Sequence, residues 1–161
     1  MRLERYSDAD LELTERLETD PEVMAELGGP IEPDAIPALH ERRLRSDERG
    51  DWWLKIVPEP GGPAAGTIGV WINEAQGGVH EVGWMLLPEM QGRGLAREAL
   101  RLLIERCRAD PRFERLHAWP GTANAASNAL CRGAGFELLE EAEVEYAGRA
   151  LRVNHWALQL S

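Results

Sequence analysis

The sequence lacks any long run of apolar residues. No stretch approaches the roughly 20 apolar residues of a membrane-spanning helix, and the opening residues, MRLER, lack the apolar core of a secretory signal peptide. We therefore expect a cytoplasmic chain that does not act at a membrane. Cysteine is also scarce, and a disulfide is disfavoured in that compartment, so Cys107 and Cys131 are expected to be small buried side chains.

Positive charge is in deficit as well. The 161 residues carry 18 basic and 28 acidic side chains, which gives a formal net charge of −10. Such a chain repels the phosphate backbone of a nucleic acid and an anionic lipid surface, whereas a cationic substrate is easier to accommodate. The chain also lacks repeats, linkers and low-complexity segments, and its length fits a single domain, residues 1–161.

Hydrophobic periodicity predicts an α/β chain. Period-two alternation in the middle of the chain, broken by glycine and proline turns, predicts a three-stranded antiparallel meander, with Trp52 and Trp53 on opposite faces. Trp71, Trp84 and Trp119 are expected to pack in the core, as is Trp156. The expected strands cover 3–6, 51–59, 66–74, 77–87, 113–120, 136–146 and 149–160, the last two turned at Ala147-Gly148. The expected helices cover 9–17, 21–26, 34–48, 94–108 and 124–135.

The segment PEMQGRGLAREAL, residues 88–100, joins a strand to a helix through two glycines. A glycine turn before a helix leaves several amides unpaired at the positive end of the helix dipole, which suits phosphate oxygens. A P-loop is excluded because the chain has no Gly-Lys pair. The dinucleotide fingerprint is met only at Gly92 and Gly94, with Arg97 at its third position. The remaining alternative is a tight connection that binds nothing.

Two motifs carry a resemblance to a known family. Residues 91–96 fit the pattern Q/R-x-x-G-x-G/A, and NAASNALCRGAGF, residues 124–136, fits N-x-x-S-N-x-x…G-F. In both motifs the chain resembles the GNAT acetyltransferases, in particular their ribosomal-protein (Rim-type) N-terminal branch. The resemblance implies a GNAT fold of the α+β type, in which a mixed, mostly antiparallel twisted sheet has helices on both faces. It also implies an acyltransferase that uses acetyl-CoA and no metal, and that acts alone or as a homodimer.

The resemblance further implies which residues hold the cofactor. The first motif would wrap the pyrophosphate of coenzyme A, and a bulge in the preceding strand would free backbone N–H groups for the pantetheine arm and the thioester oxygen. Asn124 and Asn128 of the second motif would also contact the cofactor, and the alternative for Asn124 is a plain helix cap. The implied set besides these two asparagines is Met85, Leu86, Leu87, Gln91, Gly92, Arg93, Gly94, Leu95 and Ala96.

Two residues are the candidates for catalysis. Strand alternation puts Glu81 on one face with Gly83, Met85 and Leu87, and related enzymes carry a catalytic glutamate at a comparable place. Burial would raise the pKa of Glu81 toward that of a general base; the alternatives are a solvated glutamate, and His80 on the opposite face as the base.

The thiolate of CoA must also receive a proton. Many relatives use a tyrosine, but here that position is Cys131, so a tyrosine acid is abandoned. Ser127, which resembles a serine of the Rim-type branch, could hold or relay the proton; the alternative is a packing or capping hydroxyl.

The expected acceptor is the N-terminal amine of a protein or peptide. Deprotonating an α-amine of pKa near 8 at neutral pH costs about 1.4 kcal/mol, against roughly 4.6 kcal/mol for a lysine-type amine. The acceptor pocket would be built from residues 20–48, whose acidic side chains, such as Glu26, are expected to stay solvated. A small-molecule amine (a polyamine or an antibiotic), an inactive CoA-binding module and an NAD-dependent oxidoreductase remain as alternatives.

Overall fold

The computed structural model describes residues 1–146 and 148–161, so half of the expected Ala147-Gly148 turn lies outside the described residues. Seven strands form one sheet in the order β1-β2-β3-β4-β5-β7-β6. All neighbours pair antiparallel except β4 and β5, which are parallel, so the prediction of a mixed, mostly antiparallel sheet is confirmed. The strands are β1 (Arg2–Arg5), β2 (Trp52–Val57), β3 (Gly66–Asn73), β4 (Val79–Leu86), β5 (Arg115–Ala118), β6 (Glu137–Tyr146) and β7 (Arg149–Gln159).

Four α-helices accompany the sheet in the described part of the chain: α1 (Leu11–Glu18), α2 (Ile36–Leu44), α3 (Leu95–Arg108) and α4 (Ala125–Gly133). Short 3-10 turns η1 to η5 cover Asp8–Asp10, Pro33–Ala35, Ser46–Arg49, Glu74–Gln76 and Pro88–Met90. None of the described helices is both long and apolar enough to cross a bilayer.

Two helix predictions need correction. The expected helix over 21–26 is wrong: residues 21–28 form successive turns. The Asp20 carboxylate caps a first turn by accepting from the Glu22 and Val23 amides, but Gly28 and Gly29, with φ values of 92° and 90°, end the segment before a helix is established. The expected helix over 34–48 is shorter, because the chain leaves helical geometry at Arg45 (φ −97°, ψ 14°).

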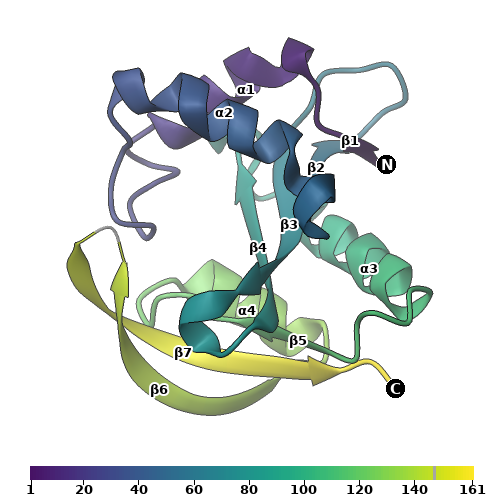
Figure 1. Ribbon diagram of the computed structural model, residues 1–161, viewed down its shortest axis with the longest axis vertical. Coiled ribbons are helices and arrows are strands. Elements are labelled where there is room, and N and C mark those ends of the chain that lie inside the picture. The colour runs from purple at the N-terminus through teal and green to yellow at the C-terminus, as the bar shows by residue number, and fades with distance from the viewer. Residues whose placement is uncertain (147) are drawn as a thin grey trace.

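Apolar side chains pack on both faces of the sheet. One cluster joins α3, α4 and the side chains of Leu54, Ile68 and Val70, and a second joins α1 to Met85 and Leu87. Trp52 packs on the first cluster and Trp53 on the second, so their predicted opposite orientation is confirmed. Figure 1 shows α1 and α2 lying side by side across the upper part of the sheet, with α3 to one side of β3 and β4.

The tryptophan and cysteine predictions have separate outcomes. Trp156 is buried in the core, so the packing prediction is confirmed for this residue. The other three tryptophans are only half-buried: Trp71, Trp84 and Trp119. Cys107 and Cys131 are both free and buried, as expected.

The two parallel strands separate soon after they meet. β4 pairs with β5 only at His80↔Leu116 and Glu81↔His117, yet β4 continues to Leu86. In Figure 1, β4 rises toward α1 and α2 while β5, β7 and β6 curve away below it. The backbone edge of β4 beyond Glu81 therefore faces an opening in the sheet.

Candidate active site

The glycine turn presents a row of open amides. Gly92 and Gly94 adopt the left-handed φ values of 76° and 75°, and a Cβ placed on either would meet nothing within 4 Å. Among the described residues, no backbone or side-chain acceptor takes the amides of residues 92–97; the first helical bond of α3 runs from the Glu98 amide to the Gly94 carbonyl. The Gln91 amide is already bonded to Pro88. Six consecutive amides at the N-terminus of a 14-residue helix are thus left without an acceptor among the described residues.

This turn fits the diphosphate of a cofactor such as coenzyme A. Unpaired amides and the helix dipole stabilise phosphate oxygens, and the absence of a β-carbon at Gly92 and Gly94 allows close approach. Arg93 is exposed and makes no ion pair with any described residue, so its charge is available to a phosphate. The Gln91 side chain donates from Nε2 to the Leu86 carbonyl (3.2 Å), which ties the turn to the end of β4.

The bulge predicted near Met85 is absent. The β3–β4 register runs without a shift from Gly66↔Leu86 to Asn73↔Val79. The Leu87 amide donates to Ala65 on the β3 side (2.9 Å), and alternation along an antiparallel strand gives the Met85 amide the same direction. Of Met85, Leu86 and Leu87, which the resemblance implied as cofactor contacts, only Leu86 therefore directs its amide to the opening beside β5. The opening comes from the divergence of β5.

Glu81 lies where β4 and β5 begin to diverge. Its Oε2 accepts from Asn73 Nδ2 (2.7 Å) and from Trp71 Nε1 (3.1 Å), while Oε1 has no donor among the described residues. Burial raises the pKa of Glu81, and the two hydrogen bonds only partly oppose this. The Trp71 ring would lie 2.5 Å from a Cβ at Gly83, so Glu81 and Gly83 share one face, as predicted. Glu81 is half-buried, and the solvated alternative does not hold.

His80 lies on the other face of β4. Its ring meets the Phe113 ring edge-on at a centroid distance of 4.7 Å, and burial lowers its pKa. It packs among the residues under α3 and does not reach the side of the sheet that holds Glu81. The structure therefore favours Glu81 over His80 as the base.

The second motif forms the first turn of α4. The Asn124 side chain accepts from the Ser127 amide (3.1 Å). Asn124 therefore caps α4, which was the alternative to a cofactor contact. Ser127 Oγ accepts from Trp84 Nε1 on β4 (3.2 Å), so the serine hydroxyl lies across the opening and keeps its own hydrogen for another acceptor. Side chains at positions 81 and 84 of a strand point to opposite faces, so Glu81 and Ser127 flank β4 from its two sides.

Asn128 is not placed to bind a cofactor. It is 7% exposed, and its Nδ2 donates to the Gly121 and Asn124 carbonyls. Its Oδ1 accepts from Asn154 Nδ2 and from Trp156 Nε1, both at 2.9 Å. These four bonds use the full capacity of the side-chain amide, so Asn128 connects α4 to β7.

Cys131 cannot replace the missing tyrosine. Its side chain is fully buried in the core below α4, and burial raises the pKa of its thiol to about 12. A group without access to the opening does not protonate a leaving thiolate there. Ser127 is the hydroxyl that α4 presents near β4.

Three aromatic side chains near Glu81 were not predicted as site residues. His117 on β5 is the register partner of Glu81, and its Nδ1 lies 2.8 Å from Nε2 of His155 on β7. Trp119 stacks on His155 with ring centroids 4.4 Å apart and a 14° interplanar angle. The sequence shows these residues only as alternate positions of two strands. Their meeting depends on β7 pairing beside β5, which no local pattern encodes.

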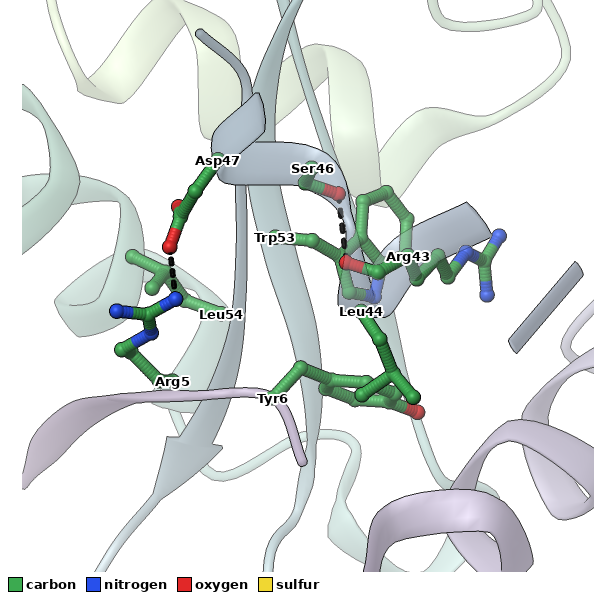
Figure 2. A pocket seen from close by; sticks show the side chains of 8 residues that line it. All are labelled: Arg5, Tyr6, Arg43, Leu44, Ser46, Asp47, Trp53 and Leu54. Atoms are coloured by element: carbon green, nitrogen blue, oxygen red, sulfur yellow. Dashed lines mark hydrogen bonds and ion pairs between the residues drawn. The ribbon is translucent and has the colours of Figure 1, made fainter. Parts of the chain in front are cut away.

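One further hollow lies among Tyr6, Arg43 and Trp53, under the end of α2 (Figure 2). Its volume of about 10 Å³ admits roughly one water molecule. Arg43 stacks 3.9 Å above the Trp53 ring and forms an ion pair with the buried Glu18, which connects α2 to α1. This hollow is too small for a substrate. No group of three or more metal-binding side chains occurs among residues 1–146 and 148–161.

A twisted sheet that opens between two parallel strands, beside a helix N-terminus with free amides, defines a site for group transfer from a diphosphate-bearing cofactor. A family model described as an acetyltransferase (GNAT) domain matches residues 1–137, and the chain belongs to this family. The protein is therefore an acyltransferase with acetyl-CoA as co-substrate and an amine as acceptor, and the oxidoreductase alternative falls. No curated protein sequence matches the chain.

Solved structures share the fold over nearly the whole chain. A spermidine N-acetyltransferase from Vibrio cholerae, in complex with CoA and spermine, is 18% identical, with 99% of this chain and 95% of that chain covered and a TM-score of 0.82. An acetyltransferase from Salmonella typhimurium that modifies the N-terminal serine of ribosomal protein L7/L12 is 17% identical (99% and 94%, TM-score 0.80). A ribosomal-protein-alanine N-acetyltransferase from Brucella melitensis is 22% identical (99% and 99%, TM-score 0.79).

Proposed function

We propose that residues 1–161 form one domain that acetylates the N-terminal amine of a protein or peptide, as in the Rim-type branch. The family match ends at residue 137, but β7 pairs with β5 along Arg115–Ala118, so the last strands complete the same sheet. Two of the similar structures are of enzymes named for ribosomal-protein substrates, which supports this acceptor class.

The chain positions the cofactor through its main chain. The amides of residues 92–97 and the Arg93 guanidinium hold the diphosphate, and the Leu86 amide directs the pantetheine arm along the opened edge of β4. When bound, acetyl-CoA supplies a thioester that the amine can attack. Donors fixed along a strand edge favour the charge that develops on the thioester oxygen, because they need no reorganisation.

Glu81 acts as the general base. The observation that carries this assignment is its geometry: Trp71 and Asn73 hold Oε2, and Oε1 is left to accept a proton from the amine directly or through water. Ser127 relays a proton to the departing thiolate: its hydroxyl hydrogen moves to the sulfur while a water molecule returns a proton to Oγ. A single carboxylate whose pKa is raised by burial suits an α-amine better than a lysine-type amine, because an α-amine needs about 3 kcal/mol less for deprotonation at neutral pH.

A polyamine is the second candidate acceptor. The net charge of −10 attracts a polycation, and one similar structure holds spermine. Its ammonium groups have the larger deprotonation cost, so we rank it below an α-amine. An inactive CoA-binding module is the third candidate, and the buried Cys131 in place of a catalytic tyrosine is the feature that favours it.

Acetyl transfer to a panel of amines separates the three candidates. The protein is incubated with acetyl-CoA and either peptides with free or blocked N-termini or spermidine, while released thiol is recorded and the product is located by mass spectrometry. We expect acetylation at the free N-terminus, and none of blocked peptides without lysine. Turnover of spermidine alone would replace the proposed acceptor class, and thermal stabilisation by CoA without thiol release would support an inactive module.

A further inference from the structure

Acetylation at this site releases a proton that needs a route out. An ammonium group loses two protons when it becomes an amide, and the CoA thiolate takes up one of them. One proton per turnover must therefore reach solvent. Glu81 is half-buried, and Trp71 and Asn73 cover one of its carboxylate oxygens. With cofactor and acceptor in the opening, its direct access to water is reduced further.

A hydrogen-bonded histidine pair begins beside Glu81. Glu81 and His117 are register partners on the parallel strands β4 and β5. Partners in adjacent strands lie about 5 Å apart with their side chains on the same face, so one water molecule can bridge the two side chains. His117 is buried, and its Nδ1 meets Nε2 of His155 at 2.8 Å. His155 is half-buried on β7, toward the edge strand β6.

We propose that His117 and His155 form a proton relay that connects Glu81 to solvent at the β7–β6 edge. The inference rests on the proposed role of Glu81. The Glu81 carboxyl gives its proton to Nε2 of His117, the Nδ1 proton of His117 moves to Nε2 of His155, and the Nδ1 proton of His155 leaves to water. Each ring accepts one proton and releases one, and no other bond changes. After the products leave, His155 Nδ1 takes a proton from solvent, the shared proton returns to His117 Nδ1, and His117 Nε2 loses its proton to water in the open site, so the starting tautomers are restored without ring rotation.

The surroundings keep this pair neutral, which the relay requires. Burial lowers the pKa of His117 to about 4, with further lowering from His155, Arg115 and His80. Burial also lowers the pKa of His155, although Glu140 on β6 opposes the shift. Two neutral imidazoles share one N–H between their facing nitrogens, so a proton that enters at one end displaces a proton at the other.

Trp119 holds the pair in position. Its ring is nearly parallel to both imidazoles, at 12° to His117 and 14° to His155. The stack restricts ring rotation, so the short nitrogen–nitrogen contact is retained during turnover. In the relay the two histidines contact neither substrate, and they act on the reaction only through Glu81.

The variants His155→Gln and His117→Gln test the relay, with His80→Gln as the matched control. His80 is a partly buried histidine of β4 on the opposite face, outside the relay. In weak buffer at pH 7 we expect kcat of His155→Gln to fall roughly tenfold, with KM for both substrates within twofold. Added imidazole should restore kcat, because a diffusible base replaces the missing ring. The control should change by less than twofold.

Two outcomes would overturn the relay: kcat of His155→Gln within twofold of wild type, or a loss of kcat that imidazole does not restore, as expected for a purely structural stack. Ring-nitrogen NMR of the resting protein gives a readout without turnover, because the relay requires both histidines neutral at pH 7, and an imidazolium in the pair would refute it. Glu81→Gln separates the two proposals: if Glu81→Gln is inactive while His155→Gln is normal, the base stands and the relay falls.

Discussion

Replacing Asn128 by alanine should destabilise the fold and leave CoA affinity unchanged. The side chain makes four hydrogen bonds, and its loss leaves the indole N–H of Trp156, a residue only 2% exposed, without an acceptor. An unsatisfied buried donor costs about 1–3 kcal/mol, and each of the other bonds contributes roughly 0.5–1 kcal/mol. We therefore expect a loss of about 3–4 kcal/mol, which lowers Tm by roughly 10 °C for a chain of this length.

Urea unfolding followed by tryptophan fluorescence gives the free energy of unfolding, and calorimetry on the folded variant gives the Kd for CoA. Asn154→Ala is the matched control, because it removes only one of the four bonds, and we expect a loss of about 1 kcal/mol. The reasoning would be refuted by a loss below 1 kcal/mol for Asn128→Ala. A tenfold weaker Kd in a stable variant would instead make Asn128 a cofactor contact.

Three further substitutions have defined outcomes. Glu81→Gln should lower kcat about 100-fold; wild-type kcat should rise with pH through a midpoint above 4.5, and a midpoint at 4.5 would contradict burial of the base. Folding raises the pKa of Glu81, so the stability that the protonated carboxyl contributes at low pH is lost as the pH rises through the folded-state pKa. In thermal unfolding at pH 7, Glu81→Gln should therefore be no less stable than wild type. Cys131→Ala should keep kcat within twofold; a larger loss would give the thiol a catalytic role. Gly94→Val should weaken CoA binding at least tenfold in calorimetry, whereas Gly61→Val, with a similar φ of 76°, should carry the same strain of about 1–2 kcal/mol without that effect.

Local patterns were sufficient for most of the fold. Helix α3 followed from apolar residues at helical spacing, and the β2–β3–β4 meander from period-two alternation between glycine turns. The failures also have local causes. The Asp20 side chain caps a first turn at residues 21–26, but the left-handed Gly28 and Gly29 end the segment before a helix is established. The Asp34–Glu48 segment breaks at Arg45, where the next residue, Ser46, turns its hydroxyl back to donate to the Arg43 carbonyl (2.7 Å) at the end of the helix.

The candidate site was predictable only where a motif marks it. The turn at 91–96 was marked by a motif that resembles a known family, and the face that holds Glu81 followed from strand alternation. The role of Asn128 could not, because its four partners come from segments up to 28 residues away. The His117–His155 contact depends on β7 lying between β5 and β6, an order that skips sequence neighbours. Strand order of this kind is set by packing of the whole sheet.

The measurement that tests the central claim most directly is an amide NMR titration of the protein with CoA and, separately, with pantetheine, which lacks the diphosphate. We expect the amide resonances of residues 92–97 to shift strongly with CoA and little with pantetheine, and the Leu86 resonance to shift with both. Binding of CoA without a shift at residues 92–97, or an equal shift with pantetheine, would contradict a diphosphate site at this turn.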